Sequence, residues 1–167
     1  MSSILLINPP NEGDAYRTIF GLISPPLGLC SIAAILRDRG HKVKILDLNS
    51  LTESYSVREV LVLLKNTVKM FKPEYVGVSI TATCTAPVSS TIAKIVKEID
   101  NEIVCIAGGH HATFMPRETL NNGFDYVVKN EGEITITELI DTLESGGSPS
   151  KVKGIAYVKD NKYIETQ

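Results

Sequence analysis

The segment that fixes the architecture is Ile4-Leu5-Leu6-Ile7-Asn8-Pro9-Pro10, residues 4–10. Four consecutive apolar residues are typical of a strand that is buried on both faces, as in a parallel sheet with helices on both sides. The two prolines cannot donate to a strand ladder, so they end it. We therefore expect residues 4–7 to form a central strand that leads into a polar turn.

Outward from this strand, short apolar runs alternate with helical patterns along the whole chain. A polar loop is expected over residues 11–25, followed by an amphipathic helix over residues 27–39 with Gly40 as its stop. Ser56 and Glu59 have the spacing of a capping box at the start of another helix. The remaining predicted strands are 43–46, 75–80, 103–106 and 126–128, and the remaining predicted helices are 57–71, 87–99, 116–122 and 134–143.

This alternation predicts an α/β fold with a doubly wound, open parallel sheet. Right-handed crossovers leave few topologies, and we expect the flavodoxin-like, Rossmann-like strand order 2-1-3-4-5. Residues 155–158 and 162–164 flank Asp160-Asn161, a pair that favours a tight hairpin turn. We expect one domain over residues 1–167, with a core at about 4–146 and a C-terminal β-hairpin at about 153–165 on the sheet edge.

Composition and charge exclude several classes of protein. The 17 basic and 19 acidic residues nearly balance, which gives no electrostatic reason to expect nucleic acid. Cys30, Cys84 and Cys105 have no metal-binding spacing, and free thiols suit a cytoplasmic protein. The first residues lack the features of a signal peptide or a membrane span, so no membrane association is expected.

Polar and glycine-rich segments follow the predicted strands, where open α/β sheets bind their ligands. They are Asn8-Pro9-Pro10, Asp47, residues 79–84, residues 108–113 and residues 130–133. Gly108-Gly109 would let a ligand approach bare backbone, or would simply form a tight turn. Alternate hydroxyls at Ser79, Thr81 and Thr83 would point to one side of a strand and suit a polar ligand, although threonine also suits any strand.

Two further groups at the strand ends carry titratable side chains. His110 and His111 are adjacent, and neighbouring residues on an extended segment point apart, so hydrogen bonding to a ligand or to a helix terminus is favoured over a metal site. Glu131-Gly132-Glu133 suits either an acid/base pair or favourable charges at the start of the next helix. The sequence has no phosphate loop and no G-x-G-x-x-G after the first strand, which disfavours the common nucleotide-binding sites.

Several of these segments, in this order, resemble a known family. The resemblance is carried by Pro25-Pro26-Leu27-Gly28-Leu29, Ile32-Ala33-Ala34, Leu36-Arg37-Asp38-Arg39-Gly40-His41-Lys42-Val43, Val76-Gly77-Val78-Ser79, Ala107-Gly108-Gly109-His110-His111-Ala112-Thr113, Pro116, and Asp125-Tyr126-Val127-Val128 leading to Glu131-Gly132-Glu133. Together they are similar to the N-terminal domain of cobalamin-dependent radical S-adenosylmethionine proteins. These proteins include anaerobic magnesium-protoporphyrin monomethyl ester cyclases and methyltransferases.

The resemblance implies a cobalamin cofactor at the carboxyl ends of the strands. In cobalamin domains a Ser-x-Thr segment and a Gly-Gly segment line the cavity for the dimethylbenzimidazole tail, and Ser79-Ile80-Thr81 and Gly108-Gly109 match them. A bulky residue at Gly109 is accordingly expected to block the tail and leave the sheet folded. The cofactor-binding residues that we expect are Asn8, Pro9, Pro10, Ser79, Thr81, Thr83, Gly108, Gly109, His110, His111, Glu131 and Gly132.

Two departures from relatives narrow the expected role. The cobalt-ligating Asp-x-His-x-x-Gly motif of other cobalamin domains is absent, and residues 8–29 contain no histidine, which implies base-off cobalamin without a protein imidazole. A Cys-x-x-x-Cys-x-x-Cys loop is also absent, so the iron–sulfur cluster and S-adenosylmethionine are expected in a separate radical domain, in cis or in trans. The domain would then not be catalytic alone. The rival hypotheses are a flavodoxin-like regulatory or docking module without cofactor, and a flavin-binding domain.

Overall fold

A seven-stranded sheet forms the centre of the protein. The computed structural model describes residues 1–11 and 24–167. The strands are β1 (Ser3–Asn8), β2 (Lys42–Asp47), β3 (Tyr75–Ser79), β4 (Val104–Gly108), β5 (Tyr126–Val128), β6 (Ile155–Lys159) and β7 (Lys162–Glu165). They lie in the order β2-β1-β3-β4-β5-β6-β7, and the first five are parallel, which confirms the predicted topology.

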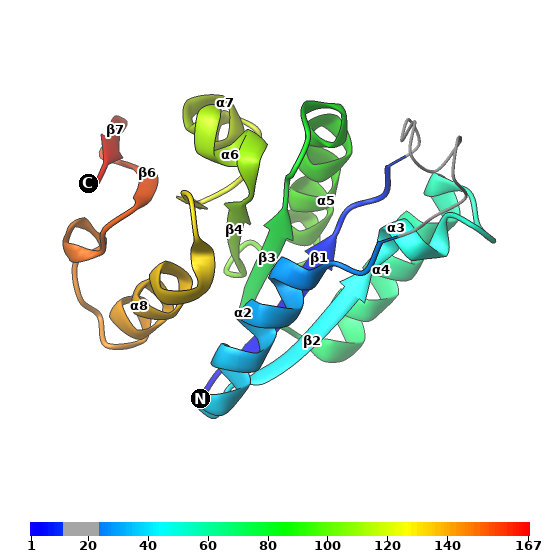
Figure 1. Ribbon diagram of the computed structural model, residues 1–167, viewed down its shortest axis with the longest axis horizontal. Helices are drawn as coiled ribbons and strands as arrows, with labels where there is room; N and C mark the ends of the chain where they lie inside the picture. The colour runs from blue at the N-terminus through cyan, green and yellow to red at the C-terminus, as the bar shows by residue number, and fades with distance from the viewer. Residues whose placement is uncertain (12–23) are drawn as a thin grey trace.

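Helices cover both faces of this sheet (Figure 1). They are α2 (Leu27–Asp38), α3 (Leu48–Leu51), α4 (Val57–Phe71), α5 (Ala86–Ile99), α6 (His110–Phe114), α7 (Pro116–Asn121) and α8 (Gly132–Glu144), with short 3-10 turns η1 (Thr83–Thr85) and η2 (Pro149–Lys151). The apolar residues of α2 and α8 pack on one face, and those of α4 and α5 pack on the other. No helix in the described ranges is long and apolar enough to span a bilayer.

Strand β1 shows why the apolar run predicts the fold. Ile4 and Leu6 pack toward α2 and α8, whereas Leu5 and Ile7 pack toward α4 and α5. Each of the four is at most 1% exposed, so a polar residue at any of them would be buried. The alternation of side chains along a strand therefore requires apolar residues at every position when both faces are covered.

Local signals set the ends of the elements as expected. The side chain of Ser56 accepts a hydrogen bond from the Glu59 backbone, and the Glu59 carboxylate accepts one from the Ser56 backbone, which completes the capping box of α4. Asp160 and Asn161 have φ of 50° and 58°, the left-handed backbone that a tight hairpin turn requires.

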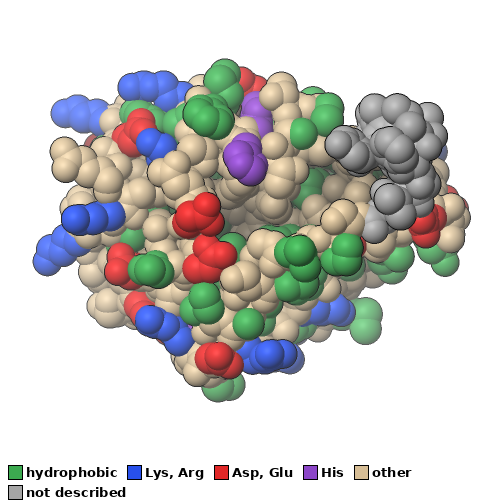
Figure 2. All heavy atoms as spheres, viewed as in Figure 1, with side chains coloured by type: hydrophobic (Ala, Val, Ile, Leu, Met, Phe, Trp, Pro, Cys, Tyr) green, Lys and Arg blue, Asp and Glu red, His purple; other side chains and the backbone are tan. Residues whose placement is uncertain are grey.

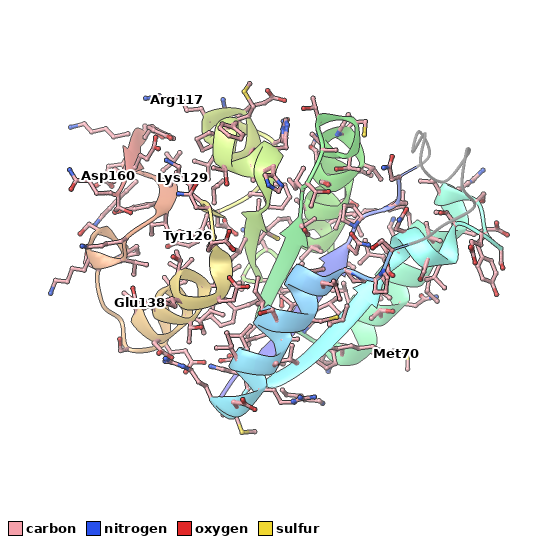
Figure 3. The ribbon with its side chains drawn as sticks, in the orientation of Figure 1. Met70, Arg117, Tyr126, Lys129, Glu138 and Asp160 are labelled. Atoms are coloured by element: carbon pink, nitrogen blue, oxygen red, sulfur yellow. The ribbon has the colours of Figure 1, made fainter. Side chains whose placement is uncertain are left out.

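The C-terminal hairpin is an integral part of the sheet, since β6 pairs antiparallel with β5. Arg117 stacks on the ring of Tyr163, with the guanidinium carbon 3.8 Å from the ring centroid. Lys129 pairs with Glu165 on the same side of the molecule; Arg117 and Lys129 are labelled in Figure 3. These contacts hold the edge strand against α7 and the end of β5.

Some boundaries differ from those predicted. Strand β4 continues through Gly108, and helix α6 begins at His110, where no helix is predicted. Strand β3 ends at Ser79, so Thr81 and Thr83 lie beyond it. Most of the predicted polar loop, residues 12–23, lies outside the described residues.

Candidate functional site

A cleft of about 860 Å³ opens between α2 and α8 at the carboxyl ends of β1, β3, β4 and β5. This volume is within the range of small-molecule and cofactor sites. In Figure 2 the hollow lies near the centre of the visible face, with histidine and acidic side chains on its rim. The site therefore lies where the parallel topology predicts a ligand, at the crevice beyond the strands.

Two glycines on neighbouring strands make the floor of the cleft bare. Tyr75 packs toward α2 and α8, while Val76 and Val78 pack toward the other face, so Gly77 lies on the α2 and α8 side. A Cβ atom at Gly77 would lie 2.8 Å from the side chain of Leu6. At Gly108 a Cβ would meet only the Val128 carbonyl oxygen, at 3.7 Å, so that position is open.

The walls of the cleft are mainly apolar, and its mouth is polar. Apolar lining comes from the sheet and from both helices, namely Leu6, Leu29, Ile32, Ile106, Val128 and Ile136. Polar lining comes from the strand ends and the loops after them, namely Asn8, Asn11, Asn49, Ser79, Thr81, Thr113, Asn130, Glu131 and Glu133. This arrangement suits a ligand that inserts a flat apolar part and leaves a polar part at the mouth.

Gly132 lets the two helices approach each other at one end of the cleft. It is the first residue of α8, and a Cβ there would lie 3.3 Å from Ile32 of α2. Glu131 is the N-cap residue of α8 and Glu133 is in its first turn, where negative charge is favourable. All three line the cleft.

Gly109 has a different role from Gly108, although both line the cleft. Its φ is +101°, and a Cβ would lie 2.7 Å from the backbone oxygen of Ile80. The chain crosses tightly here, since Ile80 donates to the Gly108 carbonyl and His111 donates to the Ile80 carbonyl. A bulky side chain at Gly109 would meet backbone rather than the open cleft, which argues against the expectation that such a variant leaves the sheet folded.

The three predicted hydroxyls do not lie together. Ser79 and Thr81 line the cleft, but Thr83 belongs to η1 and lines a separate hollow of about 200 Å³. Its hydroxyl lies 3.2 Å from Nδ1 of His111. The expected alternation fails at Thr83 because β3 ends at Ser79 and the chain then turns.

The histidine pair lies on α6, a short helix, rather than on an extended segment. His110 is exposed and lines both the cleft and the smaller hollow, whereas His111 is buried and lines only the smaller hollow. Across the described ranges, no group of three or more metal-ligating side chains is close enough to hold an ion.

His41 lies at the opposite end of the sheet. Its Nδ1 accepts a hydrogen bond from the Ser2 backbone, 3.3 Å away, and lies 3.6 Å from the Glu144 carboxylate. A hydrogen bond from the Ser2 hydroxyl lowers the pKa of Glu144. This cluster ties the N-terminus to α8 and is remote from the cleft.

The end of β1 contributes Asn8 and Pro9 to the cleft, but Pro10 is buried and does not line it. The Asn8 amide donates to the Asp47 carboxylate at 2.8 Å, which joins the ends of β1 and β2. Asn11 donates its backbone N–H to Asn49 at 3.0 Å. The mouth on this side is therefore made of carboxamides held in place by their neighbours.

Sequence reasoning missed the apolar lining and Gly77. The signal for Gly77 was present, because a glycine inside an otherwise β-branched strand marks a close approach by another group. No sequence pattern marks the residues of α2 and α8 that line the cleft, since the apolar residues of any amphipathic helix face the sheet.

The chain matches the family model for the B12 binding domain over residues 13–140. It is 37% identical over 162 residues to an uncharacterized methyltransferase from Pyrococcus horikoshii, covering 95% of this chain and 33% of that protein. It is 31% identical over 168 residues to the anaerobic magnesium-protoporphyrin IX monomethyl ester cyclase of Synechocystis sp., covering 98% of this chain and 32% of that protein. The chain thus spans about a third of the length of these relatives.

Solved structures show the same fold at low sequence identity. The radical S-adenosylmethionine methyltransferase TsrM from Kitasatospora setae, with cobalamin and a [4Fe-4S] cluster bound, has a TM-score of 0.80 and 22% identity, covering 99% of this chain and 31% of that chain. OxsB, with aqua-cobalamin and S-adenosylmethionine bound, has a TM-score of 0.75 and 18% identity, covering 99% of this chain and 22% of that chain. With its cleft at the strand ends and a family match over most of its length, this chain belongs to the B12-binding domain family.

Proposed function

We propose that the domain binds cobalamin with the nucleotide tail in the cleft between α2 and α8 and the corrin ring across the mouth. The observation that carries this proposal is the open floor at Gly108, where a side chain would extend into the cleft, beside Gly77, where a Cβ would collide with Leu6. The apolar walls match a benzimidazole base, and the polar mouth matches the amides of the corrin edge. Family membership supports the choice of cobalamin over a flavin.

Residues of three segments would hold the cofactor. Ser79 and Thr81 would donate hydrogen bonds to the tail, while Gly108 would leave room beside it. Asn8 and Asn130 would meet polar groups at the mouth. Pro10, Thr83 and His111, which were also expected to bind the cofactor, do not line the cleft and have no role in holding the tail in this proposal.

With the nucleotide tail in the cleft, its base would not reach cobalt, so the cofactor would be base-off. The lower face of cobalt would also have no imidazole from this domain. His110 is the one histidine that lines the cleft among the described residues, and it is the first residue of α6. Residues 12–23 contain no histidine in the sequence. Ligation by His110 would contradict this part of the proposal.

The parent protein would be a cobalamin-dependent radical S-adenosylmethionine methyltransferase or cyclase. The relatives are about three times as long as this chain, which leaves room for a radical domain that would hold the iron–sulfur cluster and S-adenosylmethionine. Cobalamin supplies the methyl-transfer or radical reactivity, and this domain places it. Leu27 and Phe114 line the cleft and are each more than 70% exposed, as is Ile134 on α8, and such exposed apolar side chains suit contact with a partner in cis or in trans.

Titration of the purified domain with hydroxocobalamin tests the proposal. We expect the visible bands of the cofactor to shift with saturating, one-to-one binding, and Thr91→Val, a change of an exposed threonine on α5, to leave the titration unchanged. The same titration with FMN should give no saturation. Saturable FMN binding without cobalamin binding would favour the flavin hypothesis, and binding of neither would favour the module without a cofactor.

A further inference from the structure

A second hollow adjoins the cleft and has no assigned role. It has a volume of about 200 Å³ and is lined by Thr81, Ala82, Thr83, His110, His111, Phe114 and Met115. Thr81, His110 and Phe114 line the main cleft as well, so the two spaces share one wall. A ligand at the mouth of the cleft can therefore extend a side arm into the hollow.

The hollow presents a buried imidazole in a fixed orientation. His111 is 6% exposed, its Nδ1 lies 3.2 Å from the Thr83 hydroxyl, and its backbone N–H donates to Ile80 at 3.0 Å. The hydroxyl occupies one ring nitrogen, which leaves the other nitrogen for a further hydrogen bond. That nitrogen is a donor in one tautomer and an acceptor in the other.

The lining selects against several classes of occupant. Among the described residues, the lining includes no lysine or arginine, so these residues offer no fixed positive charge to an anion. A liquid water occupies about 30 Å³, so a space of about 200 Å³ has room for a short side chain but not for a corrin ring. Phe114 and Met115 add an apolar wall for a hydrocarbon stem.

We propose that this hollow is a subsite for one propionamide arm of the corrin, with His111 hydrogen-bonded to its amide. A primary amide carries both a donor and an acceptor, so it matches His111 in either tautomer. The propionamide arms project on the same side of the corrin as the nucleotide tail, which is the side that faces this domain. The inference rests on the proposed cobalamin binding in the adjoining cleft.

The test pairs a protein variant with a ligand variant. Hydroxocobalamin and its isomeric monocarboxylates, in each of which one propionamide has been hydrolysed to a carboxylate, are titrated against the wild-type domain and His111→Phe. A phenyl ring preserves the bulk of the imidazole but forms no comparable hydrogen bond. Thr83→Val removes the hydroxyl that orients His111 at an exposed position, and Thr91→Val is the matched control.

We expect His111→Phe to weaken hydroxocobalamin binding by roughly 3- to 10-fold, as for loss of one hydrogen bond. For one monocarboxylate isomer, the ratio of the Kd of His111→Phe to that of the wild type should differ by at least about threefold from the ratio for hydroxocobalamin. For the other isomers the ratio should be unchanged, and Thr83→Val should show its different ratio with the same isomer. If every ligand is weakened equally, or none is, the subsite is wrong while cobalamin binding stands. If the wild type binds no ligand, the proposed function itself fails.

Discussion

Replacement of Gly108 by valine should abolish tail binding without harming the fold. A Cβ at this position would meet only the Val128 carbonyl oxygen at 3.7 Å, an ordinary contact, and the backbone of Gly108 is not in the left-handed region. A β-branched residue also suits strand β4. The new side chain would extend from the floor of the cleft beside Ser79, the register partner of Gly108 on β3.

The expected loss can be worked from the burial of the base. An aromatic group of this size removes roughly 150–250 Å² from water when it is buried. At about 25 cal/mol per Å² this is about 4–6 kcal/mol, or roughly 10³- to 10⁴-fold in Kd. Since the cleft is open at its mouth, part of the burial is kept, and we expect a loss of at least about 100-fold.

Absorbance titration with two ligands shows whether the loss of affinity comes from the nucleotide tail or from the rest of the cofactor. Cobinamide lacks the nucleotide base, so Gly108→Val should leave its affinity within about twofold while hydroxocobalamin falls to the level of cobinamide. Circular dichroism and thermal unfolding should match the wild type. Gly109→Ala is the contrasting neighbour, because its Cβ would clash with Ile80 and should destabilise the fold by about 1–3 kcal/mol. Unchanged cobalamin affinity in folded Gly108→Val would refute the placement of the tail.

The other predictions concern the same site and one thiol outside it. Ser79→Ala with Thr81→Val should weaken cobalamin binding by about 1–3 kcal/mol in the same titration, and a crystal structure with the tail detached from β3 would contradict it. A cobamide with adenine as its base should bind roughly 10- to 100-fold more weakly than cobalamin, because the apolar walls leave its polar atoms unpaired; equal affinity would argue against an apolar slot. Electron paramagnetic resonance of the cob(II)alamin complex should show no nitrogen triplet, and a triplet lost in His110→Ala would show that this histidine ligates cobalt, against the proposal of a lower face without a protein imidazole. Burial raises the pKa of the Cys105 thiol to about 12, so iodoacetamide should label Cys30 and Cys84 but not Cys105 in the folded domain. Because the unfolded chain would lose this proton at a lower pH than the folded domain does, the free energy of unfolding should fall as the pH rises from the ordinary thiol range toward 12, and unfolding measured at alkaline pH would show this.

The order of the elements could be predicted from local sequence signals. The apolar run at residues 4–7, the capping box at Ser56 and the Asp160-Asn161 turn each act within a few residues, so no distant contact is needed to interpret them. The crossover rule then leaves only a few strand orders, and in each of them a ligand is expected at the carboxyl ends of the parallel strands. Family resemblance added the kind of ligand, which the family match supports.

Which residues line the cleft depends on contacts between segments far apart in the sequence. Gly108 and Gly109 are adjacent and chemically identical, yet one faces open space and the other faces the backbone of Ile80. Thr83 and His111 pair across 28 residues only because β3 ends at Ser79 and α6 begins directly after Gly109. Strand register and the approach of α2 to α8 decide which atoms meet, because each side chain's surroundings are supplied by chain segments that its own neighbours do not specify.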